Sequence, residues 1–179
     1  MTDVHHLSLP PVHGLDLAPG GGAGQLREVL ALLFEDPTPL VGPLGAVLPL
    51  GSWTELLDRI ELIVGELDQP DQILLLAAHP RLGERPETVA TASSLSSREQ
   101  EELGEDPGGL VWLVYFNAFY EQRFGFRCVE FVDGRRARDL IGVLEERLWH
   151  ERSAELEAGL RAVMAIARDR LDRLSKERQ

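Results

Sequence analysis

The sequence predicts an all-α fold, arranged as a single compact domain of several helices. Apolar residues recur at helical spacing along most of the chain, and capping boxes together with Pro and Gly breaks divide it into seven or eight helices. No segment alternates clearly enough between apolar and polar residues to predict a sheet. A length of 179 residues with 44% hydrophobic content suits one domain with a substantial core.

The chain divides into an arm and a domain. Residues 1–24 are rich in Pro, Gly and His and lack regular periodicity, so we expect a flexible N-terminal arm there. Residues 25–179 form the helical domain. His5, His6 and His13 could bind a metal ion, but a mobile tail explains them more simply, and we predict no metal site.

Two Ser-x-x-Glu capping boxes, Ser52 with Glu55 and Ser96 with Glu99, mark helix starts. Pro80 ends a helix, because the residue before a proline disfavours helical geometry. The expected helices are residues 25–34, a helix from Ser52, residues 71–78, a short helix from Ser96, and residues 110–123, 136–149 and 153–175.

Three segments have more particular expectations. Residues 41–51 contain Gly and Pro and are expected to be loop or broken helix. Residues 110–123 are apolar nearly all round, which predicts a buried central helix. Residues 127–132 alternate weakly and are expected to be strand or extended loop.

Charge and cysteine content narrow the class of function. The formal net charge is −12, which argues against a nucleic-acid partner. Cys128 is the only cysteine, so neither a disulfide within the chain nor a cysteine metal cluster is expected. No apolar run approaches the roughly 20 residues of a membrane span, and no secretory leader is visible, so we expect a soluble cytoplasmic protein without a membrane partner.

A helical wheel of the last helix isolates one arginine. Arg170 falls at the edge of the apolar arc, whereas Arg161, Arg168 and Arg173 point away from it. A guanidinium facing a core needs acceptors, so Arg170 is expected either in an internal salt bridge or at a ligand site. The apolar arc itself comprises Leu156, Leu160, Val163, Met164, Ala167, Leu171 and Leu174.

Other polar residues have two interpretations on their own. His79, at a helix end, could cap the last carbonyls or do chemistry. Glu99 could serve its capping box only, and Asn117 and Tyr120 could be satisfied buried polar groups. No phosphate-binding glycine loop, zinc spacing or nucleophile elbow is present.

Four motifs in order nevertheless resemble one family, the 2-oxo-4-hydroxy-4-carboxy-5-ureidoimidazoline (OHCU) decarboxylases of urate degradation. The resemblance runs from about Leu26 to the C-terminus, and its specificity lies in the order of the motifs. They are His79-Pro80-Arg81-Leu82-Gly83, then Ser96-Ser97-Arg98-Glu99-Gln100, then Asn117-Ala118-Phe119-Tyr120 with Arg123-Phe124-Gly125-Phe126, and finally Arg170-Leu171.

The resemblance implies the all-helical OHCU decarboxylase fold and a carboxy-lyase of purine metabolism. Its reaction would remove CO2 from the ureidoimidazoline carboxylate and protonate one face, giving (S)-allantoin. It implies no metal or organic cofactor, because the substrate ring can accept the electron pair. It also implies a homodimer, since family members tend to pair.

The resemblance assigns three catalytic residues. His79 would be the general acid or base, and a side chain titrating near neutrality suits that task. Glu99 would orient the substrate or bind its hydroxyl, and Arg170 would pair with its carboxylate or carbonyl oxygens. The substrate-binding positions are Pro80, Ser96, Gln100 and the backbone of Val129 and Glu130.

This chain departs from the family around the pocket walls. The family's Pro-Phe-Val-Ile after Phe-Gly-Phe is here Arg127-Cys128-Val129-Glu130. A carboxylate at Glu130 is unfavourable beside an anionic substrate unless it points outward. The family's Glu-x-Ser-Pro-Trp lacks its tryptophan at 35–39, and its Ala-Gly-Leu is Glu101-Glu102-Leu103.

Two alternatives to a decarboxylase follow from these departures and from composition. The first is a non-catalytic helical module that binds a ureide or a protein partner. The second is an oligomeric scaffold, because the apolar helices 110–119 and 140–149 exceed the needs of one core.

Overall fold

Seven helices follow one another in the computed structural model, which describes residues 22–47, 50–84 and 107–176. No strand occurs among these residues, so the all-α class is confirmed. No helix among them is both long and apolar enough to cross a membrane. The helices are α1 (Gly22–Phe34), α2 (Thr38–Gly45), α3 (Trp53–Glu66), α4 (Gln69–Ala78), α6 (Pro107–Phe124), α7 (Ala137–Arg147) and α8 (Arg152–Lys176).

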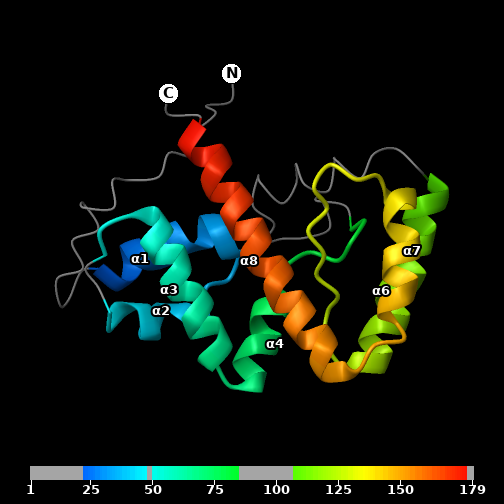
Figure 1. Cartoon of the computed structure of the whole chain (residues 1–179), viewed down its shortest axis with the longest axis horizontal. Helices are drawn as coiled ribbons and strands as arrows, with labels where there is room; N and C mark the ends of the chain where they lie inside the picture. The colour runs from blue at the N-terminus through cyan, green and yellow to red at the C-terminus, as the bar shows by residue number, and fades with distance from the viewer. Residues whose placement is uncertain (1–21, 48–49, 85–106, 177–179) are drawn as a thin grey trace.

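Helix α8 is the longest helix and organises the fold (Figure 1). Helices α1, α3 and α4 pack against it, and α2 packs on those three helices. Helices α6 and α7 pack on each other and stand on the other side of α8. The irregular wall segment, residues 125–136, connects α6 to α7 and runs beside α8.

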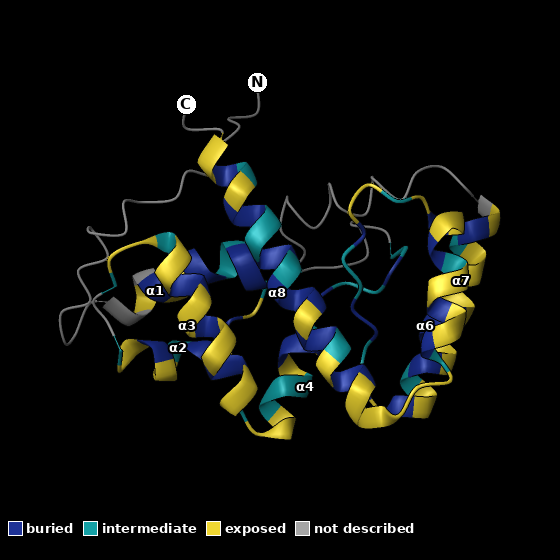
Figure 2. Cartoon of the chain, in the orientation of Figure 1, coloured by how far each residue is buried: buried dark blue, intermediate teal, exposed yellow. Residues whose placement is uncertain are grey.

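The apolar arc predicted for the last helix is confirmed, because all seven of its residues are buried. Figure 2 shows buried residues along the inner side of α8 and exposed ones along its outer side. Gly159 lies where α8 meets α4, and a Cβ there would come within 3.1 Å of both Leu76 methyl carbons. The small residue therefore sets how closely these two helices approach.

Local capping explains where α3 and α4 begin and end. The Ser52 hydroxyl accepts a hydrogen bond from the Glu55 amide at 3.1 Å, which confirms the first capping box. The Asp68 carboxylate caps α4 in the same way at 3.0 Å, with Pro70 in the first turn. Helix α4 ends at His79, whose ψ of 145° is extended as expected before Pro80.

Two expectations from the sequence need refinement around residues 35–51 and 127–132. The proline-rich stretch that ends α1 also begins α2, because Pro39 lies in the first helical turn, where a proline is tolerated. The helix continues through Pro43 to Gly45. Residues 127–132 form extended loop and no strand.

The expectation that residues 110–123 form a helix buried all round is wrong. One face of α6 packs inward through Leu113, Phe116 and Tyr120. The opposite face is exposed, with Trp112 and Phe119 at 57% and 60% exposure. Apolar residues on both faces predict a helix but not how far each face is buried, because the sequence pattern is the same for an exposed apolar face and a buried one.

Candidate active site

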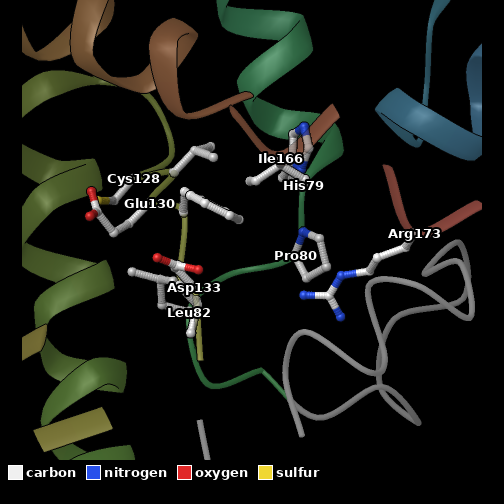
Figure 3. Close-up of a pocket in the computed structure, with 11 residues that line it drawn as sticks. His79, Pro80, Leu82, Cys128, Glu130, Asp133, Ile166 and Arg173 are labelled. Atoms are coloured by element: carbon white, nitrogen blue, oxygen red, sulfur yellow. The ribbon is translucent and has the colours of Figure 1, made fainter. Parts of the chain in front are cut away.

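The candidate site is a pocket where the end of α4, helix α8 and the wall segment meet (Figure 3). Helix α4 and the turn after it contribute His79, Pro80 and Leu82. Helix α8 contributes Ile166 and Arg173. The wall segment contributes Cys128, Val129, Glu130, Phe131, Val132 and Asp133.

His79 is the buried polar residue of this pocket. It is 3% exposed, and its Nε2 has no hydrogen-bond partner among the described residues. Helix α4 ends at this residue, so the position follows directly from the Pro80 stop signal. A buried imidazole nitrogen without a partner is costly for stability, which is typical of a group kept for a ligand.

The electrostatic setting of His79 keeps its ring neutral. Burial, reinforced by the positive charges of Arg170 and Arg127, lowers the pKa of His79 from 6.5 to about 3. Burial thus holds the pKa of this ring below the near-neutral value expected of an exposed histidine. An anionic ligand beside the imidazole would favour its protonated form and move the pKa back upward.

Glu130 does not place a free negative charge in the pocket. Its Oε1 accepts from Arg135 Nη2 and its Oε2 from Arg147 Nη1, both at 2.8 Å. The same Arg147 nitrogen donates to the carbonyl oxygen of Val129 at 3.0 Å. The acidic residue that departs from the family pattern is thus neutralised within the wall.

A buried polar network holds Arg147 in turn. Its Nε donates to Glu155 at 2.8 Å, and the Tyr120 hydroxyl donates to the same carboxylate at 2.5 Å. His150 Nδ1 lies 2.7 Å from the other Glu155 oxygen. Burial alone would raise the pKa of Glu155, but hydrogen bonds from Tyr120, Arg147 and His150 hold it below its ordinary value. The sequence interpretation of Tyr120 as a satisfied buried polar group is confirmed.

Arg170 is fully buried, not at the edge of the core. Its Nη1 lies 2.9 Å from Glu35 Oε1 and donates to the Leu33 carbonyl at 3.2 Å. The internal salt bridge, one of the two roles considered for Arg170, is therefore present. Arg170 does not line the pocket, although its charge acts on His79 from behind.

The pocket brings together four of the eight predicted site residues, namely His79, Pro80, Val129 and Glu130. Glu99, Ser96 and Gln100 lie outside the described residues.

Arg173 corrects the helical wheel. It was expected to point away, but its side chain is 28% exposed, lines the pocket and extends toward Pro80 (Figure 3). Its Nε lies 2.6 Å from Asp169 on the preceding turn. A wheel gives only the direction of the Cβ atom, and a long side chain can reach around a helix to a neighbouring cavity. Asp133 and Cys128 also line the pocket without any prior signal.

The described residues contain no cluster of three His, Cys, Asp or Glu side chains that could hold a metal ion. The polar side chains that line the pocket are the His79 imidazole, the Asp133 and Glu130 carboxylates and the Arg173 guanidinium, together with the buried Cys128 thiol.

Comparison with known proteins gives a consistent family. Residues 22–172 match the family model described as OHCU decarboxylase. The 2-oxo-4-hydroxy-4-carboxy-5-ureidoimidazoline decarboxylase of Haloferax volcanii is 33% identical over 176 residues, covering 97% of this chain and all of that protein. The uric acid degradation bifunctional protein PucL of Bacillus subtilis is 33% identical over 151 residues, and the match covers 82% of this chain but only 29% of PucL.

A solved structure confirms the fold independently. The crystal structure of an (S)-allantoin synthase aligns with a TM-score of 0.61 and 19% identity, covering 92% of this chain and 54% of that one. At that identity the likeness speaks for the fold alone. The family model, by contrast, spans most of the chain and includes each of the four ordered motifs. The chain belongs to the OHCU decarboxylase family.

Proposed function

We propose that the chain is a carboxy-lyase that converts OHCU to (S)-allantoin without a cofactor. The observation that carries this proposal is the buried, neutral His79 with an unpartnered Nε2 at the pocket. The Haloferax relative is named as a decarboxylase of this substrate, and the Bacillus relative is named as a protein of uric acid degradation.

A neutral imidazole suits the proton movements that this reaction needs. The substrate carries a hydroxyl and a carboxylate on one ring carbon, beside an imine-like carbon. When the bond to the carboxylate breaks, CO2 leaves and the electron pair moves into the ring onto the imine nitrogen, which takes a proton from solvent. The hydroxyl oxygen must then lose a proton to become a carbonyl, and the adjacent carbon must gain one. His79 can accept the first proton and deliver one to the carbon on its own face.

The remaining roles follow the family resemblance and stay proposals. Glu99 orients the substrate or binds its hydroxyl, while Ser96, Gln100 and Pro80 line the pocket. The backbone of Val129 and Glu130 binds the ureido and ring amides, an assignment supported by the outward pairing of the Glu130 carboxylate. Arg170 neutralises substrate charge through its electrostatic field, because its side chain is paired with Glu35 and is absent from the pocket lining.

The test is the appearance of optically active allantoin, followed by circular dichroism, from urate with urate oxidase and hydroxyisourate hydrolase. We expect the wild type to accelerate it and His79→Ala to lose the acceleration. His13→Ala, in the predicted arm, is the matched histidine control and should behave as wild type. A wild type no faster than the spontaneous, racemic background would contradict the proposal. It would favour the alternative, a module that binds a ureide or a protein partner.

We further propose that the chain forms a homodimer through one face of the α6–α7 pair. This α6–α7 face carries a band of exposed apolar side chains, and Figure 2 shows exposed residues along both helices. A cavity of about 330 Å³ lies there, lined by Trp112, Phe116, Phe119, Ile141 and Leu148 among others. Apolar patches of this kind mark interaction sites. Exposed aromatic side chains beside an apolar cavity suit a two-fold interface, in which each copy contributes the same surface. The exposed band comprises Val111, Trp112, Val114, Tyr115, Phe119, Val143 and Trp149.

The oligomeric state tests this interface. We expect light scattering to give the mass of two chains for the wild type and of one chain for the double variant Trp112→Glu/Phe119→Glu. Leu62 on α3 is equally exposed, at 60%, so Leu62→Glu is the matched control and should stay dimeric. A wild-type mass of one chain would exclude the dimer.

We also propose that the protein is located in the cytoplasm. Cell fractionation tests this location.

A further inference from the structure

Arg127 reaches from the wall segment back to the end of α4. Its Nη1 donates to the Ala77 carbonyl at 2.7 Å and also to the carbonyl of His79. The last carbonyls of a helix have no partner within the helix, and a cation at that end is favoured by the helix dipole. One arginine thus satisfies the end of α4 at the residue that carries the pocket imidazole.

The arginine is itself held in place from both sides. Gly125, with a φ of 77°, ends α6 and turns the chain toward α4. Glu121, on the last turns of α6, forms a double hydrogen bond with Arg81 at 2.8 and 2.9 Å. The same carboxylate lies 3.9 Å from Arg127 Nε. Cys128 and Val129, directly after Arg127, are buried. The end of α6 and the end of α4 are therefore fastened together through Arg127.

We propose that Arg127 is a positioning residue for His79, fixing the backbone at 77–79 so that the imidazole is presented to the pocket. This inference rests on the proposed decarboxylase function.

Arg127 also contributes to the charge around His79. The carboxylate of Glu35 is engaged by Arg170, and that of Glu130 by Arg135 and Arg147. Removing Arg127 would take away one of the two positive charges that disfavour the imidazolium. Among the described residues, the charged groups that act on the imidazole or share its pocket are Arg170 and Arg173 on α8 and Arg127, Glu130 and Asp133 on the wall segment, with Glu35 paired to Arg170.

The test compares Arg127→Met, Arg127→Lys and the control Arg161→Met, an exposed arginine on the outer face of α8. We expect Arg127→Met to lower kcat roughly tenfold or more, with a smaller change in KM, because the imidazole is misplaced. Arg127→Lys, which keeps a cationic donor, should recover part of kcat. Arg161→Met should match the wild type.

An NMR titration of the His79 ring provides a readout that does not depend on activity. The pKa of His79 should rise in Arg127→Met, because one positive charge is lost, although burial and Arg170 still hold it below 6.5, and exchange of the His79 amide should speed up. If Arg127→Met fails to fold, Arg127→Lys carries the same comparison. Wild-type kcat together with an unchanged titration would overturn the proposal. If the wild type has no decarboxylase activity but the His79 titration still shifts in Arg127→Met, only the proposed function would be overturned.

Discussion

His79 makes a sharp prediction at the scale of a single residue, because it is buried without charge. In the unfolded chain the ring binds a proton below its ordinary pKa of 6.5, whereas in the folded chain it does so only near 3. Between these values the unfolded state holds more protons. The contribution of His79 to stability is therefore complete above 6.5 and is lost as the pH falls, by at most about 1.4 kcal/mol per pH unit.

Substituting His79→Gln should remove this pH dependence. We expect urea unfolding to show that the wild type loses free energy of unfolding faster than the variant as the pH falls from 6.5 toward about 4.5. Carboxylates titrate in both proteins, so the difference between the two curves isolates the histidine. Parallel curves would show that the ring is accessible to protons in the folded state.

The buried pair of Arg170 and Glu35 gives a second prediction at the residue scale. Arg170→Met removes the guanidinium that lies 2.9 Å from the Glu35 carboxylate, which is 3% exposed, and should destabilise the fold by roughly 3–5 kcal/mol. Adding Glu35→Gln removes the buried negative charge that Arg170 neutralises and should restore part of that loss. If Arg170 also assists the reaction, the double variant stays inactive after its stability returns. Recovery of activity together with stability would limit Arg170 to a structural role.

The sequence predicted individual residues only where a local signal existed. His79 was predicted from a proline and a family motif. Helical periodicity placed Arg170 only at the edge of the apolar arc, and the structure buries it fully. Its partner Glu35 was not predicted, because the two residues are far apart in the chain and only the packing of α1 on α8 joins them. Arg127 and Arg147 were missed for the same reason, since the carbonyls that they bind belong to other segments.

At the scale of the helices, the close packing of α4 on α8 at Gly159 and Leu76 can be tested by substitution. An alanine normally stabilises a helix interior by about 0.5–1 kcal/mol over glycine. Gly142→Ala in α7, where no atom lies within 4 Å of the new Cβ, should show this gain. Gly159→Ala should not, because its Cβ would meet two methyl carbons of Leu76 at 3.1 Å.

Thermal unfolding of both variants measures the difference. Leu76 is fully buried and cannot move aside easily, so Gly159→Ala should also displace α4 and lower kcat through His79. A Gly159→Ala protein as stable and active as Gly142→Ala would show that the helices can accommodate the extra methyl group.

The helices themselves were predictable from capping and periodicity. How far each helix is buried was not predictable, as the exposed face of α6 shows.

For the whole molecule, the proposed division into an arm and a domain can be tested by truncation. Residues 1–24 are rich in Pro, Gly and His and lack helical periodicity, which predicts an arm outside the core. A variant without residues 1–21 should therefore keep its melting temperature and its activity. A clear fall in melting temperature would mean that these residues contribute to the fold. The arrangement of the helices around α8 was beyond the sequence, because it depends on contacts between distant segments.

The burial of Cys128 has a practical consequence for following motions of the wall segment. The thiol is 1% exposed, and burial raises its pKa to about 12, so it is almost entirely protonated and shielded from reagents. As the only cysteine of the chain, it gives a single labelling signal. The rate of that labelling reports how often the wall segment opens. A molecule bound in the pocket beside Cys128 should slow this labelling. The labelling rate of Cys128 therefore measures whether a candidate substrate occupies the pocket.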